Sequence, residues 1–166
     1  MKEITCKKLS LEAFSKYGSY ANMINPDTIK IGEAPIEFFR DMVSSNLGQA
    51  TLASFSVCRC AKRPNIIEVS EYHNSCCEVM MPIDGDVLMH VAPAVPQKDF
   101  PYDLVEVFYI PKGTLVITNP GVWHHGAYPV DNDVVNCLVV LPERLYMTDC
   151  YGFTFPEDKY IKIMAD

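Results

Sequence analysis

The chain has 166 residues, of which 49% are hydrophobic and 21% charged, and its formal net charge is −7 with a pI near 5.0. This length suits one folded core and is short for two domains. The acidic balance argues against nucleic acid or an anionic membrane as the main partner. The longest apolar runs, such as residues 134 to 141, have the length of strands and are too short to span a bilayer.

The chain contains seven cysteines, an odd number. The members of the pairs Cys58/Cys60 and Cys76/Cys77 are too close in sequence for easy ring-closing disulfides, and the first eight residues lack the apolar stretch of a signal peptide. We therefore expect a reduced, cytoplasmic protein whose cysteines mainly act as small hydrophobes. A zinc site built from both pairs is an alternative, although neither pair has C-x2-C spacing.

The first predicted element is a short helix that begins at Ser10 and ends at Gly18, with Phe14 on its buried face. Ser is a good helix cap, and Gly commonly follows the last turn of a helix. Residues 19 to 48 are predicted to be irregular because prolines and glycines interrupt them. A short amphipathic helix over residues 36 to 43 is the exception that we expect there.

From residue 50 onward the pattern predicts short strands separated by turn residues. The predicted strands cover residues 50–58, 66–73, 78–82, 87–92, 104–110, 114–118, 122–128 and 134–141. In the first of them, Leu52, Phe55 and Val57 are the positions that we expect to be buried. Evenly spaced short strands of this kind indicate a closed or sandwiched antiparallel β fold.

These elements predict a single domain over residues 1–166. Residues 1–49 would form an N-terminal helix and an irregular extension, and residues 50–150 would form the barrel. Residues 151–166 would pack back across the barrel. The sequence contains no internal repeat, low-complexity tract or linker that would divide it.

Two stretches about forty residues apart are predicted to form one site. The first reads Glu71-x-His73-x4-Glu78-x6-Gly85, and the second reads Gly113-x5-Asn119-Pro120-Gly121-x2-His124. Alternate residues of a strand share a face, so Glu71 and His73 would both point into the barrel. Polar groups that converge inside an apolar barrel are costly to bury unless they bind something. The spacing therefore predicts a binding site rather than four unrelated residues.

These two stretches resemble the paired cupin motifs, G-x5-H-x-H-x3-4-E-x6-G and G-x5-P-x-G-x2-H-x3-N. Glu71 stands where cupins usually have their first His, and His73, Glu78 and His124 stand at the second His, the Glu and the last His. The glycine positions also match. Asn119 replaces the usual Pro, and Tyr128 replaces the closing Asn. The resemblance implies a mainly β cupin fold, an RmlC-like jelly-roll antiparallel barrel, with a short α-helical N-terminal extension.

A narrower resemblance runs along nearly the whole chain, to the ureidoglycolate lyase family, formerly called ureidoglycolate hydrolase. It rests on residues 9–18 (LSLEAFSKYG), on Glu71-Tyr72-His73 against the family's E-R-H, on Val91-Ala92-Pro93, and on Gly121-Val122-Trp123-His124-His125 against its G-V/T-W-H-H. Two departures stand out: Tyr72 replaces the family's Arg, and Glu78 replaces its Gln. The second departure restores the acidic ligand of metal-binding cupins.

The resemblance implies a lyase that eliminates urea from ureidoglycolate to give glyoxylate, an activity of allantoin and purine catabolism. The substrate would be a small acid. The alternatives are a metal-dependent cupin of another class, such as an isomerase or dioxygenase on a small hydroxy acid or sugar, and a cupin that binds a small ligand without catalysis. The exposed sheet edges of such a barrel, and the family resemblance, make a homodimer the expected assembly.

The predicted metal ligands are Glu71, His73, Glu78 and His124. Two imidazoles and two carboxylates suit divalent Mn, Fe, Co, Ni or Zn, with positions left open for substrate. Without a metal, His73 or Glu71 would act as the base, and His124 or His125 as the acid. Strand alternation would point His125 away from the barrel, so a structural role for it is equally open.

A substrate carboxylate needs a cationic partner, and the sequence offers Arg40, Arg59 and Arg63 without choosing among them. Tyr128 and Trp123 are further candidates for contact with substrate, although both also suit core or wall positions. Each candidate at the site has a plainer interpretation too. The carboxylates could be solvated strand residues, and the imidazoles could be bonded to the backbone in the core.

Overall fold

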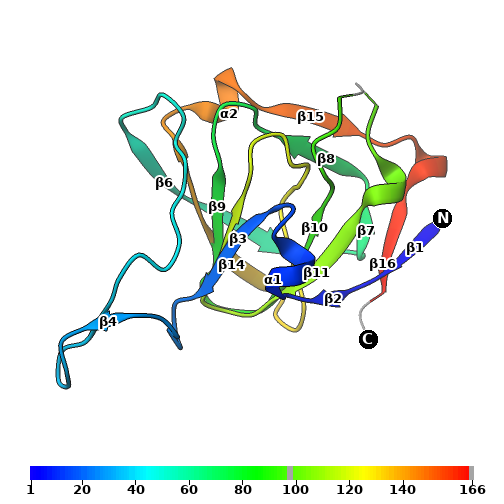
Figure 1. Cartoon of the computed structure of the whole chain (residues 1–166). Helices are drawn as coiled ribbons and strands as arrows, with labels where there is room; N and C mark the ends of the chain where they lie inside the picture. The colour runs from blue at the N-terminus through cyan, green and yellow to red at the C-terminus, as the bar shows by residue number, and fades with distance from the viewer. Residues whose placement is uncertain (97–98, 165–166) are drawn as a thin grey trace.

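Short strands dominate the computed structural model, which describes residues 1–96 and 99–164 (Figure 1). The strands are β1 Lys2–Thr5, β2 Lys7–Lys8, β3 Gly18–Asn22, β4 Lys30–Ile31, β5 Phe38–Phe39, β6 Ala53–Ala61, β7 Ile66–Ile67, β8 Val69–Tyr72, β9 Glu78–Pro82, β10 Val87–Val91, β11 Glu106–Ile110, β12 Thr114–Thr118, β13 Tyr128–Pro129, β14 Val134–Pro142, β15 Tyr151–Thr154 and β16 Ile161–Met164. The helices are short: α1 Leu11–Phe14, α2 Leu145–Thr148, and the 3-10 turns η1 Tyr102–Leu104 and η2 Glu157–Lys159. Within the described residues, none of the helices has the length and apolar character needed to cross a membrane.

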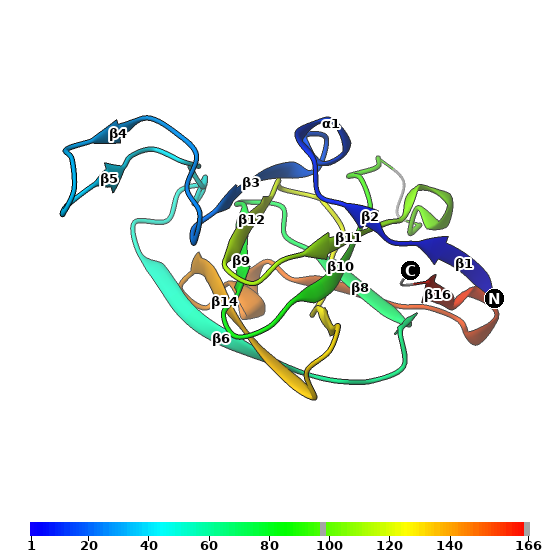
Figure 2. The same cartoon turned by 90° about the horizontal axis from the view of Figure 1, so that it is seen from below.

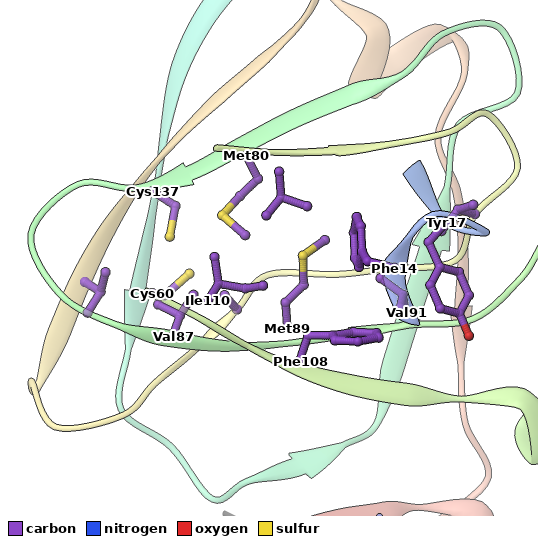
Figure 3. Packing of buried hydrophobic residues seen from close by; sticks show 14 residues of the cluster. Phe14, Tyr17, Cys60, Met80, Val87, Met89, Val91, Phe108, Ile110 and Cys137 are labelled. Carbon is purple, nitrogen blue, oxygen red and sulfur yellow. The ribbon is translucent and has the colours of Figure 1, made fainter. Parts of the chain in front are cut away.

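Two sheets enclose the main core. One has five strands in the order β3-β12-β9-β14-β6, and the other has four in the order β13-β10-β11-β2. Side chains from both sheets meet between them, with Met80 on β9 close to Met89 on β10 and Phe108 on β11 (Figure 3). Alternation along each strand explains this layer, since every second residue points to the same face. The protein is therefore mainly β, with the two-sheet architecture of a jelly-roll.

A second apolar cluster lies on the other face of the four-stranded sheet. Leu88 and Val107 pack there against Ile67 and Ile161, which belong to the three-stranded sheet β1-β16-β7. Strand β15 pairs with β8 in a further two-stranded sheet. The C-terminal residues thus add strands beside the barrel, and Figure 2 shows them next to the N-terminal strand β1.

The structure confirms most of the predicted strands, but the inward face predicted for residues 50–58 was wrong. Leu52, Phe55 and Val57 are exposed, while Cys60 on the opposite face of β6 is buried. The register explains the error: β6 pairs with β14 so that Cys58 lies opposite the buried Cys137. The strand lies at the edge of its sheet, so its apolar outer residues have no covering layer.

Three further local predictions need correction. Residues 36–43 form no helix; strand β5 within them pairs with β4 in a hairpin that projects from the barrel (Figure 1). Part of the segment predicted to be irregular is strand β3, which pairs with β12. Residues 122–128 are not one strand, since only isolated bridges and β13 occur there. Strand pairing overrode local propensity in these segments, with a neighbouring segment for β5 and with a distant one for β3.

The N-terminal helix carries the first testable prediction. Ser10 Oγ accepts a hydrogen bond from Ala13 N at 3.2 Å, as the sequence predicted for a cap, and Phe14 is completely buried with its ring 5.3 Å from that of Phe108. We expect Phe14→Ala to lower the free energy of unfolding by about 3–5 kcal/mol in denaturant titrations, because it leaves a cavity in the core. The exposed Leu11 on the same helix is the control, and Leu11→Ala should change stability by less than about 0.5 kcal/mol. A loss below about 1 kcal/mol for Phe14→Ala would contradict the packing described.

Candidate active site

Backbone pairing brings the two motif stretches together. Glu71 N donates to His124 O at 2.7 Å, and His124 N donates to Glu71 O at 2.8 Å. Gly121 N also donates to His73 O at 2.7 Å. Gly121 has a φ of +78°, a conformation that glycine adopts without strain. Glu78 begins β9, which lies between β12 and β14, so its carboxylate approaches the same point from a third direction.

Backbone carbonyls orient both imidazoles. His73 Nδ1 donates to Asp149 O at 2.7 Å, and His124 Nδ1 donates to Val122 O at 2.8 Å, because a carbonyl can only accept. The Nε2 atoms therefore face the interior of the site. Glu78 Oε2 lies 3.1 Å from His73 Nε2 and 3.4 Å from His124 Nε2. The carboxylate thus sits between two imidazoles whose rings cannot turn away without losing a hydrogen bond.

The charges of this group are strongly coupled. Burial opposes the ionised form of Glu78, but His124 and His73 outweigh burial and lower its pKa from 4.5 to about 2. Burial likewise disfavours the charged forms of His73 and His124, and the Glu78 carboxylate outweighs it, so both pKa values are raised. The site therefore holds Glu78 as an ionised carboxylate between two imidazoles, and both imidazoles have a raised affinity for protons.

The donor set fits a divalent cation. The ligand atoms of Glu71, His73 and His124 all lie within 4.8 Å of one another. His124 Nε2 is buried, and within the described residues no aligned hydrogen bond satisfies it. A buried polar atom without such a bond is costly unless a ligand completes it. Imidazole nitrogens fixed through Nδ1, together with carboxylate oxygens, are typical ligands of divalent transition metals.

A cavity of about 250 Å³ opens beside this group, and Glu71, His73, Glu78 and His125 line it. His125 therefore reaches the site, because residues 122–127 bend instead of alternating as a strand would. Burial is the largest influence on the His125 pKa and lowers it, which favours the neutral imidazole. His90, by contrast, is buried away from the cavity and bonds to Ser70 Oγ at 3.0 Å.

The C-terminal half of the chain closes the cavity with residues that the sequence did not single out. Cys150 Sγ donates to Glu71 Oε2 at 3.2 Å, and Arg144 and Tyr146 line the cavity around α2. Asp149 holds the turn after His73, with Oδ2 accepting from Ser75 N at 2.7 Å. No motif marks these residues, because their role depends on where residues 143–150 cross the barrel.

The three arginines expected as candidates for the substrate carboxylate are not among the residues that line the cavity. Arg40 pairs with its neighbour Asp41 beyond the projecting hairpin, and Arg59 is exposed on β6 opposite Asn136. Arg63 donates to Gly126 O at 2.7 Å and to Ala127 O at 2.9 Å. Of the arginines in the described residues, Arg144 is the one in the cavity wall.

Trp123 and Tyr128 also lie outside the cavity wall and belong to the second apolar cluster. The Trp123 ring lies 4.5 Å from that of Tyr72, and the Tyr128 hydroxyl donates to Ile66 O at 2.7 Å. The Arg63 guanidinium lies 3.9 Å above the Tyr128 ring. Both aromatic residues therefore support the core, as their plainer interpretation stated, and neither contacts the cavity.

With this geometry in view, the comparisons with known proteins identify the family. The family model described as ureidoglycolate lyase matches residues 1–162. This chain belongs to the ureidoglycolate lyase family. None of the curated proteins compared with it gives a match.

A solved structure supports the fold. A dTDP sugar isomerase from Desulfovibrio desulfuricans G20 is similar with a TM-score of 0.50 and 10% identity, covering 85% of each chain. At this identity the likeness concerns the fold alone. RmlC from Streptococcus suis, solved with dTDP-D-xylose, gives a TM-score of 0.38 and 14% identity, covering 71% of this chain and 62% of its own.

Proposed function

We propose that this protein is a lyase that eliminates urea from ureidoglycolate or a close relative, assisted by a divalent metal. The observation that carries the proposal is the set of Glu71, His73, Glu78 and His124 beside one cavity. Membership of the ureidoglycolate lyase family supports the reaction class. A divalent cation held by these residues would bind the hydroxyl and carboxylate of an α-hydroxy acid and lower the pKa of its hydroxyl.

The reaction needs a group that takes a proton and a group that gives one. The substrate hydroxyl loses its proton, the carbon–nitrogen bond breaks, the carbon becomes the aldehyde of glyoxylate, and the departing nitrogen is protonated as urea forms. His125 is the histidine of the cavity wall that is left free if His73 and His124 hold a cation. Its lowered pKa suits a base, which revises the acid role that the sequence suggested for it.

Arg144 is proposed as the partner of the substrate carboxylate, because it is the arginine of the cavity wall among the described residues. Its own partner, Glu143 Oε1, is 3.4 Å away and exposed, so the guanidinium can turn toward a ligand. We expect Arg144→Gln to raise KM roughly tenfold or more with a smaller change in kcat, as loss of ground-state binding does. Arg59→Gln is the control on β6. Equal kinetics for the two variants would exclude Arg144 as the anchor.

A second candidate function rests on the apolar residues of the cavity lining. Met80, Met89, Val139 and Leu141 make this part of the wall apolar. A ureido group brings several donors and acceptors that such a wall cannot satisfy. Together with Glu78 in place of the family's Gln, this favours a metal-dependent cupin that acts on a small hydroxy acid with an apolar end.

The deciding experiment measures glyoxylate release from ureidoglycolate against an enzyme-free blank, before and after chelator treatment and after metal is restored. Release that chelator abolishes and metal restores supports the metal-assisted lyase. Release that is indifferent to chelator would remove the metal from the proposal. No release with any supplied metal would reject this substrate and favour the second candidate, to be tested with hydroxy acids of increasing chain length.

We further propose a cytoplasmic homodimer. Strand β6 ends its sheet with an unpaired edge, and its outer residues Phe55 and Val57 are exposed. Long apolar edge strands favour pairing with another chain. None of the seven cysteines, all of which lie in the described residues, forms a disulfide, which is consistent with a reducing compartment. In sedimentation equilibrium we expect twice the chain mass for the wild type and the single mass for Phe55→Asp/Val57→Asp; a monomeric wild type would reject the dimer.

A further inference from the structure

We propose that the inner wall of the cavity carries a second metal site, a thiol cluster that binds a soft monovalent cation of the Cu(I) type. Its ligands are the thiols of Cys58 and Cys60, and the thiol of Cys137 lies near them on the next strand. This site is distinct from the carboxylate and imidazole group described above, and the inference does not rest on the proposed lyase reaction.

The geometry brings two thiols to a distance that suits a shared ion. Cys58 and Cys60 alternate on β6, so both side chains lie on the face of the strand that lines the cavity, and their Sγ atoms lie 3.7 Å apart. Sulfurs bound to one metal at about 2.3 Å lie at a similar separation. Both cysteines line the cavity and neither is in a disulfide.

The neighbouring strand supplies a third thiol. The register of β14 on β6 places Cys137 directly opposite Cys58. Figure 3 shows the sulfurs of Cys60 and Cys137 pointing toward each other, with the thioether of Met80 on the same side of the core. Cys137 and Met80 also line the cavity. Thiolates with nearby thioethers form an environment that selects Cu(I) over harder cations.

The cavity gives an ion access to these thiols. Cys58 is exposed, and Gly126 leaves space beside the pair, since a Cβ there would lie 3.8 Å from Cys58 Sγ and 4.0 Å from Cys60 Sγ. The alternative zinc site would need Cys58 and Cys60 together with Cys76 and Cys77, but Cys77 lies in a separate cluster with Val79 and Ile117. Binding would be a ligand exchange in which each coordinating thiol releases its proton to solvent and nothing is oxidised.

The test is an anaerobic titration of Cu(I) held by a coloured Cu(I) chelator, bathocuproine disulfonate. We expect the wild type to withdraw close to one Cu(I) per chain. Cys58→Ser/Cys60→Ser should bind at least tenfold more weakly, because it removes two ligands. Cys76→Ser/Cys77→Ser, a double cysteine variant outside the cavity, is the matched control and should bind like the wild type. Glu78→Gln should also bind like the wild type if the two metal sites are separate.

A second measurement does not depend on the folding of a variant. In wild-type protein, Cu(I) should protect the exposed Cys58, but not Cys6, from maleimide, with the modified residues identified by mass spectrometry. Protection of Cys58 would support the site. Failure of the wild type to compete with the chelator, equal affinity of the two double variants, or an unprotected Cys58 would each overturn it.

Discussion

Replacing His124 by alanine is expected to abolish divalent-metal binding and to lower glyoxylate release by a factor on the order of 100 to 10,000. His124 is buried, its ring is fixed by Val122 O, and its Nε2 faces Glu78. Alanine removes one of the three donors whose ligand atoms lie within 4.8 Å of one another. His90 does not line the cavity and is bonded to Ser70, so it does not replace the lost imidazole.

Metal content by mass spectrometry and the rate of glyoxylate release measure the two effects. His124→Ala also leaves a space in a buried position, so added imidazole provides the internal control. Partial recovery of metal and of rate with imidazole, in a protein whose thermal unfolding is otherwise little changed, would assign the loss to the missing ligand. Full metal content and full rate in the variant without imidazole would show that His124 has only a structural role.

The second large effect is expected for Glu78→Gln, which installs the residue that the family pattern has at this position. The variant removes the anion between the two imidazoles but keeps their burial, so the pKa values of His73 and His124 should fall. We expect the metal affinity to drop by about tenfold or more. Metal-assisted release should fall with it, whereas a metal-free reaction would be retained.

The same variant has a pH signature. The folded-state pKa of Glu78 is lowered from 4.5 to about 2, so its ion pairs contribute stability above about pH 4.5 that is lost as the pH falls toward 2. The difference in unfolding free energy between wild type and Glu78→Gln, measured without metal, should therefore shrink over that interval. A difference that is constant from pH 6 to about pH 2 would contradict the ion pairing.

Glu106→Gln is the matched control for these measurements. Glu106 is also a largely shielded carboxylate whose pKa is lowered, because Lys7 and Lys16 at 2.9 and 3.0 Å outweigh the effect of burial. It lies outside the cavity that holds Glu78. We expect Glu106→Gln to change acid stability without changing metal affinity. An equal loss of metal in both variants would mean that Glu78 acts through stability and not as a ligand.

The predictions that succeeded rest on local chemistry. Ser10 caps the helix because its hydroxyl can reach the backbone three residues later, and this needs no information from the rest of the chain. Most strands were predicted because turn residues bound them and their side chains alternate. The spacing of Glu71 and His73, and the Asn119 to Gly121 bend before His124, predicted that these residues converge, and the resemblance to the cupin motifs implied the kind of barrel.

The tertiary structure decided which way side chains face and what closes the site. Phe55 and Val57 have the sequence pattern of a buried strand face, yet the register with β14 turns Cys58 and Cys60 inward, and a shift of one residue exchanges the two faces. Arg144 reaches the cavity because residues 143–150 cross it, a contact between segments far apart in sequence. The sequence by itself determined the kind of barrel and the residues that converge in it, because these depend on local spacing. The cavity wall, including Arg144, His125 and the three thiols, depended on long-range packing that no local pattern records.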